Sequence, residues 1–280
     1  MNKYLIKYNF KNIDCFKKID ESWKAYFLGW AYSDGCIEKN LYRFRINLQE
    51  GDKEVLDFFT SKIYSSNRPL LYKKLTNSKN QFVFTISNKS VVADLLKLGL
   101  YPNKSLTLKF PSVDQVPENF LKFFVRGLFE GDGYFSVIRK NMGVRVGILG
   151  SYILLEKLKG HLFQIGIKSS IVAKGKIGVL QIRERNDVFN FYNYIYSDTE
   201  PFVLSRKFEK FSSAYKLRDH CRSSNKTSKY RGICFRPSIK RWISRVSINK
   251  KRINLGCFLT EEDAFNARKS FLKENGIQHE

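Results

Sequence analysis

The sequence predicts an α+β protein built from two similar halves and a small third module. Three observations carry this prediction. The nonapeptide FLGWAYSDG at 27–35 recurs as VRGLFEGDG at 125–133, each copy closes an apolar helical stretch, and strand-like segments follow each copy in the same order. We therefore expect two αββαββα halves related by a pseudo-twofold axis, followed by a three-stranded sheet with one helix.

The first half begins with a helix that ends at the repeated nonapeptide. Acidic and hydroxyl side chains at 20–22 suit the start of this helix. After it, apolar and polar residues alternate over 42–49, which predicts a strand with one apolar face and one basic, amide-rich face. Beyond that strand we expect a helix at 52–63, strands at 69–75 and 81–87, and a helix at 90–98.

The second half repeats this order. Pro117 suits the first position of a helix and Glu118 favours its dipole, so a helix is expected to begin there. Strands are expected at 134–140, 144–148, 169–174 and 178–183, and helices at 154–166 and 187–196. Apart from strands that the sequence of the first half leaves unresolved, the two halves match, and we place them at residues 1–110 and 111–216.

The composition changes near residue 216. Residues 216–252 contain thirteen Lys or Arg residues but a single acid, Asp219. Within this range the stretch RSSNKTSK is polar and has no apolar periodicity. Residues 217–228 are therefore expected to form a basic linker. Strands at 231–236, 241–248 and 251–258, then a helix starting near Thr260, are expected to form the module at 229–280.

The charge balance indicates a polyanionic partner. Fifty Lys and Arg residues against 26 Asp and Glu residues give a formal net charge of +24, and this excess opposes compaction unless a polyanion binds. The positive charge is spread along the chain among strand-like segments, which favours nucleic acid over a basic membrane-binding helix. A basic surface that serves only solubility fits a surplus of this size poorly.

Cysteine use and hydropathy exclude several other classes. The five cysteines at 15, 36, 221, 234 and 257 form no CxxC pair, which argues against a disulfide framework and a zinc ribbon. No apolar run reaches the roughly 18 residues that a membrane span requires, and the first ten residues lack a signal-peptide core. We therefore expect an intracellular protein without membrane contact.

In each repeat a carboxylate stands at the C-terminal end of a helix, directly before a glycine. These acids are Asp34 and Asp132, and a negative charge there is disfavoured by up to about 1 kcal/mol unless a cation compensates. Gly29 and Gly127 would let the two helices pack closely and bring both carboxylates to one place. Two carboxylates with water suit magnesium, which supports hydrolysis of a phosphodiester. One Asp-Gly pair would indicate only a turn, but two in matched frames favour a metal site.

The two nonapeptides resemble the LAGLIDADG motif, whose last acid is the metal ligand and catalytic residue of its family. The resemblance covers most of residues 20–215, including LLKLGLYPNKSLTL before the second copy and LSRKFEKF after it. It implies a single-chain homing endonuclease that uses Mg²⁺ or Mn²⁺ to cut both DNA strands, with Asp34 and Asp132 as catalytic metal ligands.

The same resemblance assigns further roles and shows departures. Lys104 and Lys207 match the basic residue near each active centre, where a cation stabilises developing charge; the alternative is an ordinary surface lysine. At motif position six, often acidic, stand Tyr32 and Glu130, and Trp30 is bulky where an aliphatic residue is usual. These departures spare the metal-binding acids but leave room for unequal cutting of the two strands.

Members of this family lay a saddle of antiparallel strands along the major groove. The polar strand faces found here are therefore expected to contact double-stranded DNA, through phosphates and through base edges. Gln49 also matches a polar residue that orders active-site water. The candidates in the two halves are Arg43, Arg45, Asn47, Gln49, Lys73, Lys74, Arg139, Lys140, Arg145 and Arg183.

The third module resembles the plant ethylene-response-factor (APETALA-type) DNA-binding domain. The resemblance lies in YRG at 230–232, RW at 241–242, LGCF at 255–258 and EEDAFNAR at 261–268. It implies that the three-stranded sheet reads the major groove. The candidates are Arg231, Arg236, Arg241, Trp242 and Arg245. For Trp242, packing of the helix onto the sheet is the alternative role.

The leading hypothesis is a monomeric, site-specific DNA endonuclease of the kind that mediates intron homing. An RNA-splicing maturase, with intron RNA as its partner, and a non-cleaving DNA-binding regulator remain alternatives because both share the fold. Both usually tolerate loss of a catalytic acid, and here both acids are present. An intein is not expected because the chain lacks a terminal His-Asn. An HNH nuclease is not expected either, since the histidines at 161, 220 and 279 form no metal-binding cluster.

Overall fold

The computed structural model describes residues 9–66, 68–76, 79–138, 143–223, 228–248 and 251–277. Its contacts divide the chain into two compact units, Met1–Ser212 and Ser213–Glu280. The predicted α+β fold is confirmed: the first unit contains two halves with matching elements, and the second contains a small sheet and a helix. Two of the candidate DNA-contacting residues, Arg139 and Lys140, lie outside the described residues.

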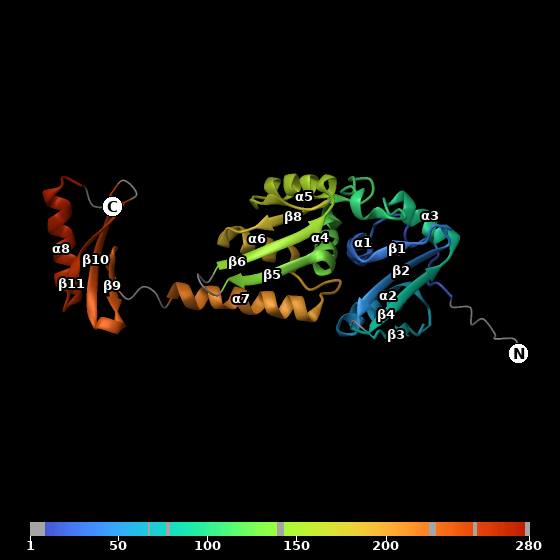
Figure 1. Cartoon of the computed structure of the whole chain (residues 1–280), viewed down its shortest axis with the longest axis horizontal. Coiled ribbons are helices and arrows are strands. Elements are labelled where there is room, and N and C mark those ends of the chain that lie inside the picture. Colours follow the sequence, from blue (N-terminus) through green and yellow to red (C-terminus); the bar gives the residue numbers. More distant parts are fainter. Residues whose placement is uncertain are drawn as a thin grey trace, which may run out of the picture. The chain divides into compact units, whose positions relative to one another are not determined.

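The first half consists of a helix followed by a four-stranded antiparallel sheet with further helices (Figure 1). The elements are α1 (Ser22–Ser33), β1 (Gly35–Ile37), β2 (Arg43–Gln49), the 3-10 turn η1 (Glu50–Asp52), α2 (Lys53–Ile63), β3 (Leu71–Lys73), β4 (Gln81–Ser87), α3 (Lys89–Lys97) and the 3-10 turn η2 (Lys104–Leu106). The strands lie in the order β1-β2-β4-β3. Of the four strands, β1, which directly follows Asp34, lies where the sequence predicted no strand.

The second half has the same arrangement. Its elements are α4 (Glu118–Asp132), β5 (Gly133–Ile138), β6 (Gly143–Gly150), α5 (Tyr152–Gln164), β7 (Ser170–Lys174), β8 (Ile177–Ile182), α6 (Arg185–Tyr196) and α7 (Ser205–Ser223). Its strands lie in the order β5-β6-β8-β7, so the first, second, fourth and third strands of each half are neighbours in the same sequence. This identity of topology confirms the correspondence that the repeated nonapeptide predicted.

Strand β2 has the amphipathic pattern that its sequence predicted. Phe44 and Ile46 are fully buried, whereas Arg45 is half-buried and Asn47 is exposed. Since side chains alternate between the faces of a strand, the apolar face packs into the core and the basic face is directed away from it. Strand β2 pairs with β4 so that Ile46 lies opposite Phe84, and both side chains are buried in the core.

The two motif helices α1 and α4 lie side by side between the two sheets (Figure 1). Helix α1 is buried from Trp23 to Tyr32 because α4 covers one side and the first sheet and its helices cover the rest. The closest approach is at Gly29 and Gly127, where a Cβ atom on Gly29 would lie 2.7 Å from Leu128 N and 2.9 Å from Gly127 Cα. Glycine at both positions therefore allows backbone contact between the helices.

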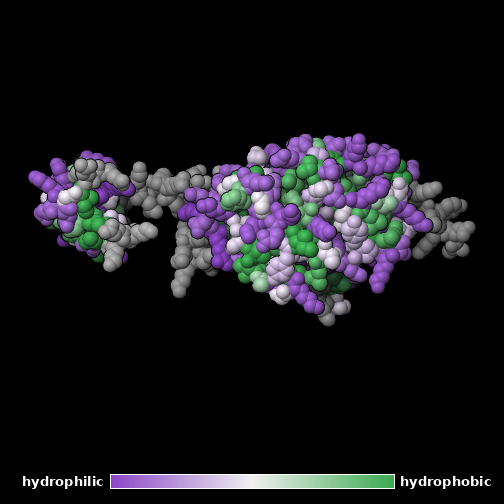
Figure 2. Space-filling model, turned by 90° about the horizontal axis from the view of Figure 1, so that it is seen from above, coloured by the Kyte–Doolittle hydropathy of each residue, from purple (hydrophilic) through white to green (hydrophobic). Residues whose placement is uncertain are grey.

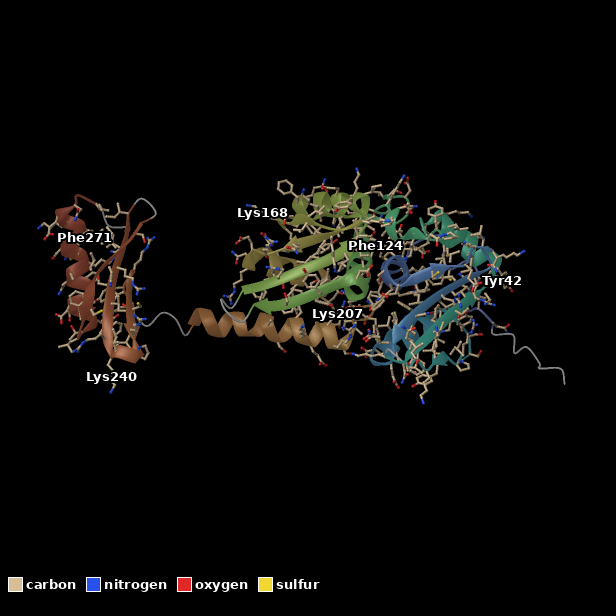
Figure 3. The ribbon with its side chains drawn as sticks, viewed as in Figure 1. Tyr42, Phe124, Lys168, Lys207, Lys240 and Phe271 are labelled. Carbon is tan, nitrogen blue, oxygen red and sulfur yellow. The ribbon has the colours of Figure 1, made fainter. Side chains whose placement is uncertain are left out.

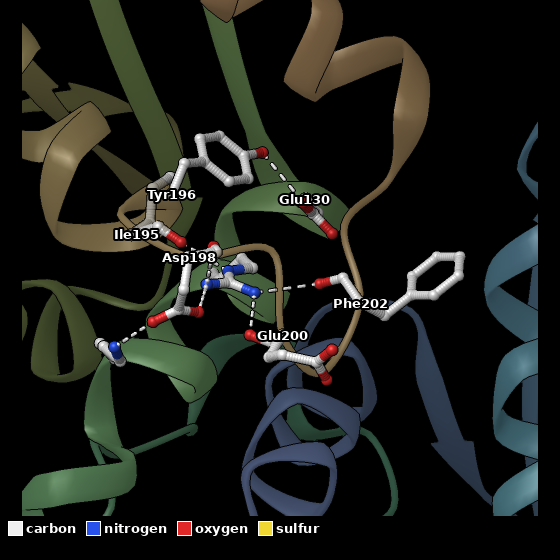
Figure 4. Close-up of polar contacts among 8 residues, drawn as sticks. Glu130, Ile195, Tyr196, Asp198, Glu200 and Phe202 are labelled. Atoms are coloured by element: carbon white, nitrogen blue, oxygen red, sulfur yellow. Dashed lines mark hydrogen bonds and ion pairs between the residues drawn. The ribbon is translucent and has the colours of Figure 1, made fainter.

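A buried arginine ties α4 to the loop that leads into α7. The guanidinium of Arg126 is fully buried and donates to the carbonyl oxygens of Ile195, Glu200 and Phe202 and to Asp198 (Figure 4). Five donors of one guanidinium are thus used in fixing this loop.

A buried carboxylate crosses the helix pair close by. Glu130 of α4 accepts hydrogen bonds from the hydroxyl groups of Tyr26 on α1 and Tyr196 on α6. Burial raises the pKa of Glu130 to about 7. The acid at motif position six therefore links the helices and does not reach the helix ends.

Helix α7 extends further than the sequence indicated. It ends at Ser223, so residues 217–223, which the sequence analysis assigned to a basic linker, are helical. Lys216, Leu217 and Arg218 are good helix formers, and no glycine or proline stops the helix there. Residues 224–227 of the predicted linker lie outside the described residues.

The second unit contains the predicted sheet and helix. Its elements are β9 (Ile233–Arg236), the 3-10 turn η3 (Pro237–Ile239), β10 (Arg241–Ile248), β11 (Lys251–Phe258) and α8 (Glu261–Glu274). The strands lie in the order β11-β10-β9 and are antiparallel. Helix α8 begins at Glu261, next to the predicted start near Thr260, and the Thr260 hydroxyl caps it by accepting from the Asp263 N–H at 3.1 Å.

The exposed surface is consistent with the composition. Hydrophilic residues cover much of the face shown in Figure 2, with smaller hydrophobic patches between them. None of the helices in the described part of the chain combines the length and the apolar character needed to cross a bilayer.

Candidate metal centre and nucleic-acid interface

The two repeated aspartates lie at adjoining helix ends. Asp34 follows the last residue of α1 and caps it through its N–H, which donates to Trp30 O at 2.9 Å, while Asp132 is the last residue of α4. A Cβ atom on Gly131 would lie 2.8 Å from Asp34 Oδ2, so the Asp34 carboxylate lies against the backbone directly before Asp132. The packing of α1 on α4 thus brings the two acids together.

The electrostatics of the two carboxylates reflect this proximity. Burial and, to a smaller extent, the negative charge of Asp34 raise the pKa of Asp132 to about 6, while the charges of Lys104 and Lys207 oppose the rise. Burial also raises the pKa of Asp34, although this residue keeps the greater solvent access of the two. Two desolvated negative charges close together are unfavourable without a cation.

The two lysines predicted from the motif contexts occupy matching positions at the helix ends. Lys104 Nζ donates to Tyr32 O at 2.7 Å and to Ser33 O at 3.0 Å, the last carbonyl groups of α1. At the end of α4, Lys207 Nζ donates to Phe129 O at 3.0 Å, Gly131 O at 3.3 Å and Gly133 O at 2.6 Å.

These contacts place each ammonium group where a cation is favourable. Helix C-termini carry partial negative charge and unpaired carbonyl groups, and both lysines satisfy them. Burial lowers the pKa of Lys104, and it lowers that of Lys207 to about 8, where the charge of Arg206 adds to the effect. Neither lysine is an ordinary surface residue, since Lys104 is buried and Lys207 is half-buried.

The donor set at this centre fits a hard divalent cation. The lysine ammonium groups bond to backbone carbonyls, while Asp34 is exposed and Asp132 is half-buried at the helix ends. In the described part of the chain no three His, Cys, Asp or Glu side chains are grouped as a closed metal site. Two carboxylates with remaining positions for water and phosphate oxygen suit Mg²⁺ or Mn²⁺, which rarely occupy all-protein cages.

The basic face of the first sheet forms a hollow. Its lining includes four residues proposed from the sequence, Arg43, Arg45, Asn47 and Lys73, together with Arg68, which the sequence analysis missed. Glu38 Oε1 lies 2.9 Å from Arg45 Nη2 and 3.5 Å from Arg43 Nη1, which orients both guanidinium groups. Lys74 lies beyond the end of β3 and is exposed.

The remaining candidates of the first unit are dispersed. Gln49 ends β2 and lines a separate hollow with Asp52 and Arg206. Arg145 on β6 is half-buried, and its Nε has no hydrogen-bond partner among the described residues. Arg183 follows β8, is exposed, and donates from Nε to Gln181 Oε1 at 2.9 Å.

In the second unit the proposed arginines differ in exposure. Arg231, Arg236 and Arg241 are exposed, and β9–β10 pairing sets Arg236 opposite Arg241, whereas Arg245 is half-buried. The ring of Trp242 is half-buried and lies 5.2 Å from the ring of Phe235. The tryptophan therefore takes part in packing.

Sequence reasoning missed a polar contact between the halves near Lys207. Arg206 forms an ion pair with Asp52 and Ser205 is bonded to Glu54, so the first turn of α7 meets the start of α2. In the sequence, acids at 52 and 54 look like ordinary first-turn acids of a helix. Nothing in the sequence pairs them with residues some 150 positions away.

The match to a known protein family lies in the second half of the first unit. Residues 119–196 match the family described as the LAGLIDADG-like domain. No curated protein matches the chain in sequence.

Three of the solved structures that are similar to this chain are described as LAGLIDADG proteins or domains. The LAGLIDADG meganuclease I-AabMI bound to uncleaved DNA has 13% identity and a TM-score of 0.49, over 73% of this chain and 92% of that chain. The I-LtrWI LAGLIDADG homing endonuclease bound to target DNA has 12% identity and a TM-score of 0.48, over 78% and 94%. The N-terminal LAGLIDADG domain of DUF199/WhiA has 15% identity and a TM-score of 0.42, over 65% and 87%. The family match covers residues 119–196, and the first half repeats the strand order found there.

Proposed function

We propose that this chain is a divalent-metal-dependent homing endonuclease that makes a double-strand break in DNA. The observation that carries the proposal is the convergence of Asp34 and Asp132 at the adjoining ends of α1 and α4. The net charge of +24 and the match of residues 119–196 to a LAGLIDADG-like domain support it. Because one chain supplies both halves, it acts as a monomer.

The residues at the centre have separate roles in hydrolysis. Mg²⁺ or Mn²⁺, when bound, supplies Lewis-acid stabilisation of the attacking and leaving oxygens. Asp34 and Asp132 would hold and orient this ion. Lys104 and Lys207, fixed on the helix-end carbonyls, place positive charge where negative charge develops on the phosphoryl group. Gln49, at the exposed end of β2, lines a hollow with Asp52 and Arg206 and would order water there.

The basic strand faces bind the DNA duplex. Arg43, Arg45 and Lys73 line one hollow and contact phosphates, while Asn47 in the same hollow presents an amide suited to an adenine edge. Lys74, Arg145 and Arg183 extend these contacts. The second unit enlarges the site through Arg231, Arg236, Arg241 and Arg245, in the manner of an ethylene-response-factor domain.

The test begins by selecting bound sequences from a randomised double-stranded DNA library with Ca²⁺ in place of Mg²⁺. Selected duplexes, cloned into a supercoiled plasmid, are then incubated with the protein in Mg²⁺ and in EDTA. We expect linear product in Mg²⁺ and none in EDTA. No cleavage of any selected DNA would contradict the proposal; tight, specific binding of RNA in addition would favour a maturase, and tight DNA binding alone a regulator.

Removal of residues 224–280, which include the sheet and α8 of the second unit, tests the proposed role of that unit. A chain ending at Ser223 keeps α7 and all four residues of the candidate centre but loses the arginines of β9 and β10. We expect weaker DNA binding and a shallower salt dependence of the affinity, because fewer phosphates are neutralised. Cleavage at saturating protein should stay near the full-chain rate. An unchanged affinity and salt slope would contradict DNA binding by this unit.

A further inference from the structure

The start of α7 is fastened to the first half by two carboxylates. Arg206 Nε lies 2.5 Å from Asp52 Oδ1 and Arg206 Nη2 lies 2.7 Å from Asp52 Oδ2, a bidentate ion pair. Glu54 accepts from the Ser205 N–H at 2.9 Å and from the Ser205 hydroxyl at 3.0 Å. We call these four residues the clasp.

The two sides of the clasp differ in exposure. The side chain of Asp52 is 8% exposed, whereas that of Arg206 is 55% exposed. Burying an ionised carboxylate to this extent costs free energy unless it is paired with a positive charge. The ion pair with Asp52 therefore favours one position of the Arg206 guanidinium. Glu54 in turn accepts the first N–H of α7, which is a favourable position for a negative charge at a helix start.

The residue next to the clasp is Lys207, whose ammonium group must reach the end of α4. Lys207 projects from the start of α7 (Figure 3), and its Nζ donates to three carbonyl groups there. Burial lowers the pKa of Lys207, because the ammonium group loses hydrating water when it makes these contacts. Such a group needs its backbone held in place, and the clasp holds the residue on its N-terminal side.

The other lysine is held differently. Lys104 lies in the short turn η2, and Ser151 donates through its hydroxyl to the carbonyl of Leu108, four residues further on. That support comes from the second half, but it is a neutral bond to the backbone. Two carboxylates of the first half bind the residues directly before Lys207: Asp52 pairs with Arg206, and Glu54 caps α7 at Ser205. Among the described residues, Lys104 has no such pair of carboxylates directly before it. The two lysines thus depend on different anchors.

We propose that the clasp is a positioning device that sets Lys207 for the cutting of one of the two DNA strands. The inference rests on the endonuclease function proposed above. Arg206 and Asp52 touch neither the reacting atoms nor the metal; they act through Lys207. Disturbing the clasp displaces one lysine while Lys104 keeps its place, so the two strand cuts become unequal.

The experiment follows both cuts of a supercoiled plasmid that carries a selected target site. Nicked circles report the first cut and linear molecules the second. The variants are Arg206→Gln, Asp52→Asn and the double variant in the full chain. For each single variant we expect the slower cut to fall by about tenfold, as for a small misplacement of a catalytic group, with accumulation of nicked circles. The double variant should be no slower than either single variant, because both remove one interaction.

Two further variants distinguish the positioning of Lys207 from a general loss of positive charge. Lys210→Gln removes a positive charge from an exposed position of the same helix, one turn later, and should leave the ratio of nicked to linear product unchanged. Arg206→Lys keeps the charge and should restore part of the second cut. If both cuts slow equally, or if only thermal stability falls, the clasp is structural and the proposal is wrong. If the wild-type protein cuts no DNA, the endonuclease function itself fails.

Discussion

Asp34→Asn and Asp132→Asn are each expected to abolish double-strand cleavage while leaving DNA affinity close to that of the wild type. Each change keeps the shape of the side chain but removes one of two negative charges that hold the metal. Loss of an outer-shell partner already costs about 10- to 100-fold in metal sites, and loss of a direct ligand should exceed that. Plasmid cleavage under saturating protein measures the effect, and a gel-shift assay in Ca²⁺ measures binding.

A stability measurement separates this loss from misfolding. Both carboxylates are desolvated near negative helix ends, and the charge of Asp34 opposes ionisation of Asp132. In EDTA the asparagine variants should therefore unfold at the same temperature as the wild type or higher. Asp114→Asn, in an exposed turn before α4, serves as the matched control and should cleave normally. Cleavage by either centre variant at the wild-type rate would overturn the assignment of that aspartate.

Gly29→Ala is expected to impair both folding stability and cleavage. In an open helix this change is stabilising by about 1 kcal/mol. Here the new Cβ would meet the carbonyl oxygen of Phe124 and lie 2.7 Å from Leu128 N, so backbone of α4 would have to move. Such overpacking costs roughly 1–3 kcal/mol. Because the acids lie at the ends of these helices, a forced separation should also displace one carboxylate from the other.

A matched control lies in α5. A Cβ atom on Gly160 would meet nothing within 4 Å, so Gly160→Ala should stabilise the protein and leave cleavage unchanged. Chemical denaturation of both variants gives the difference in the free energy of unfolding, and plasmid cleavage gives the functional effect. If Gly29→Ala were as stable and as active as Gly160→Ala, close packing of α1 on α4 would not be needed for the site.

Much of the architecture could be predicted because its signals are local. The repeated nonapeptide, the alternation along β2 and the helix start near Thr260 are each signals within a few residues, and the structure confirmed each of these predictions. The meeting of Asp34 and Asp132 also followed from a local feature, since glycine at one position in each helix permits close packing. The second unit followed from strand patterning in the same way.

The remaining features depend on contacts between distant segments. The extent of α7 was missed because a polar, basic stretch without apolar periodicity resembles a linker, although its residues favour a helix. Arg126 was not singled out, since only the fold shows that it binds a loop some 70 residues away. The clasp joins residues whose sequence contexts contain no sign of each other. The role of the lysines in satisfying helix-end carbonyls likewise appears only in three dimensions.

The central claim is that Asp34 and Asp132 form one shared metal site. Its most direct test is a Mn²⁺ titration of the protein bound to a selected DNA duplex, with free Mn²⁺ followed by its electron paramagnetic resonance signal. We expect the wild-type complex to remove Mn²⁺ from solution, and both Asp34→Asn and Asp132→Asn complexes to bind it far more weakly. Mn²⁺ binding by either variant with wild-type affinity and stoichiometry would contradict a site that needs both carboxylates.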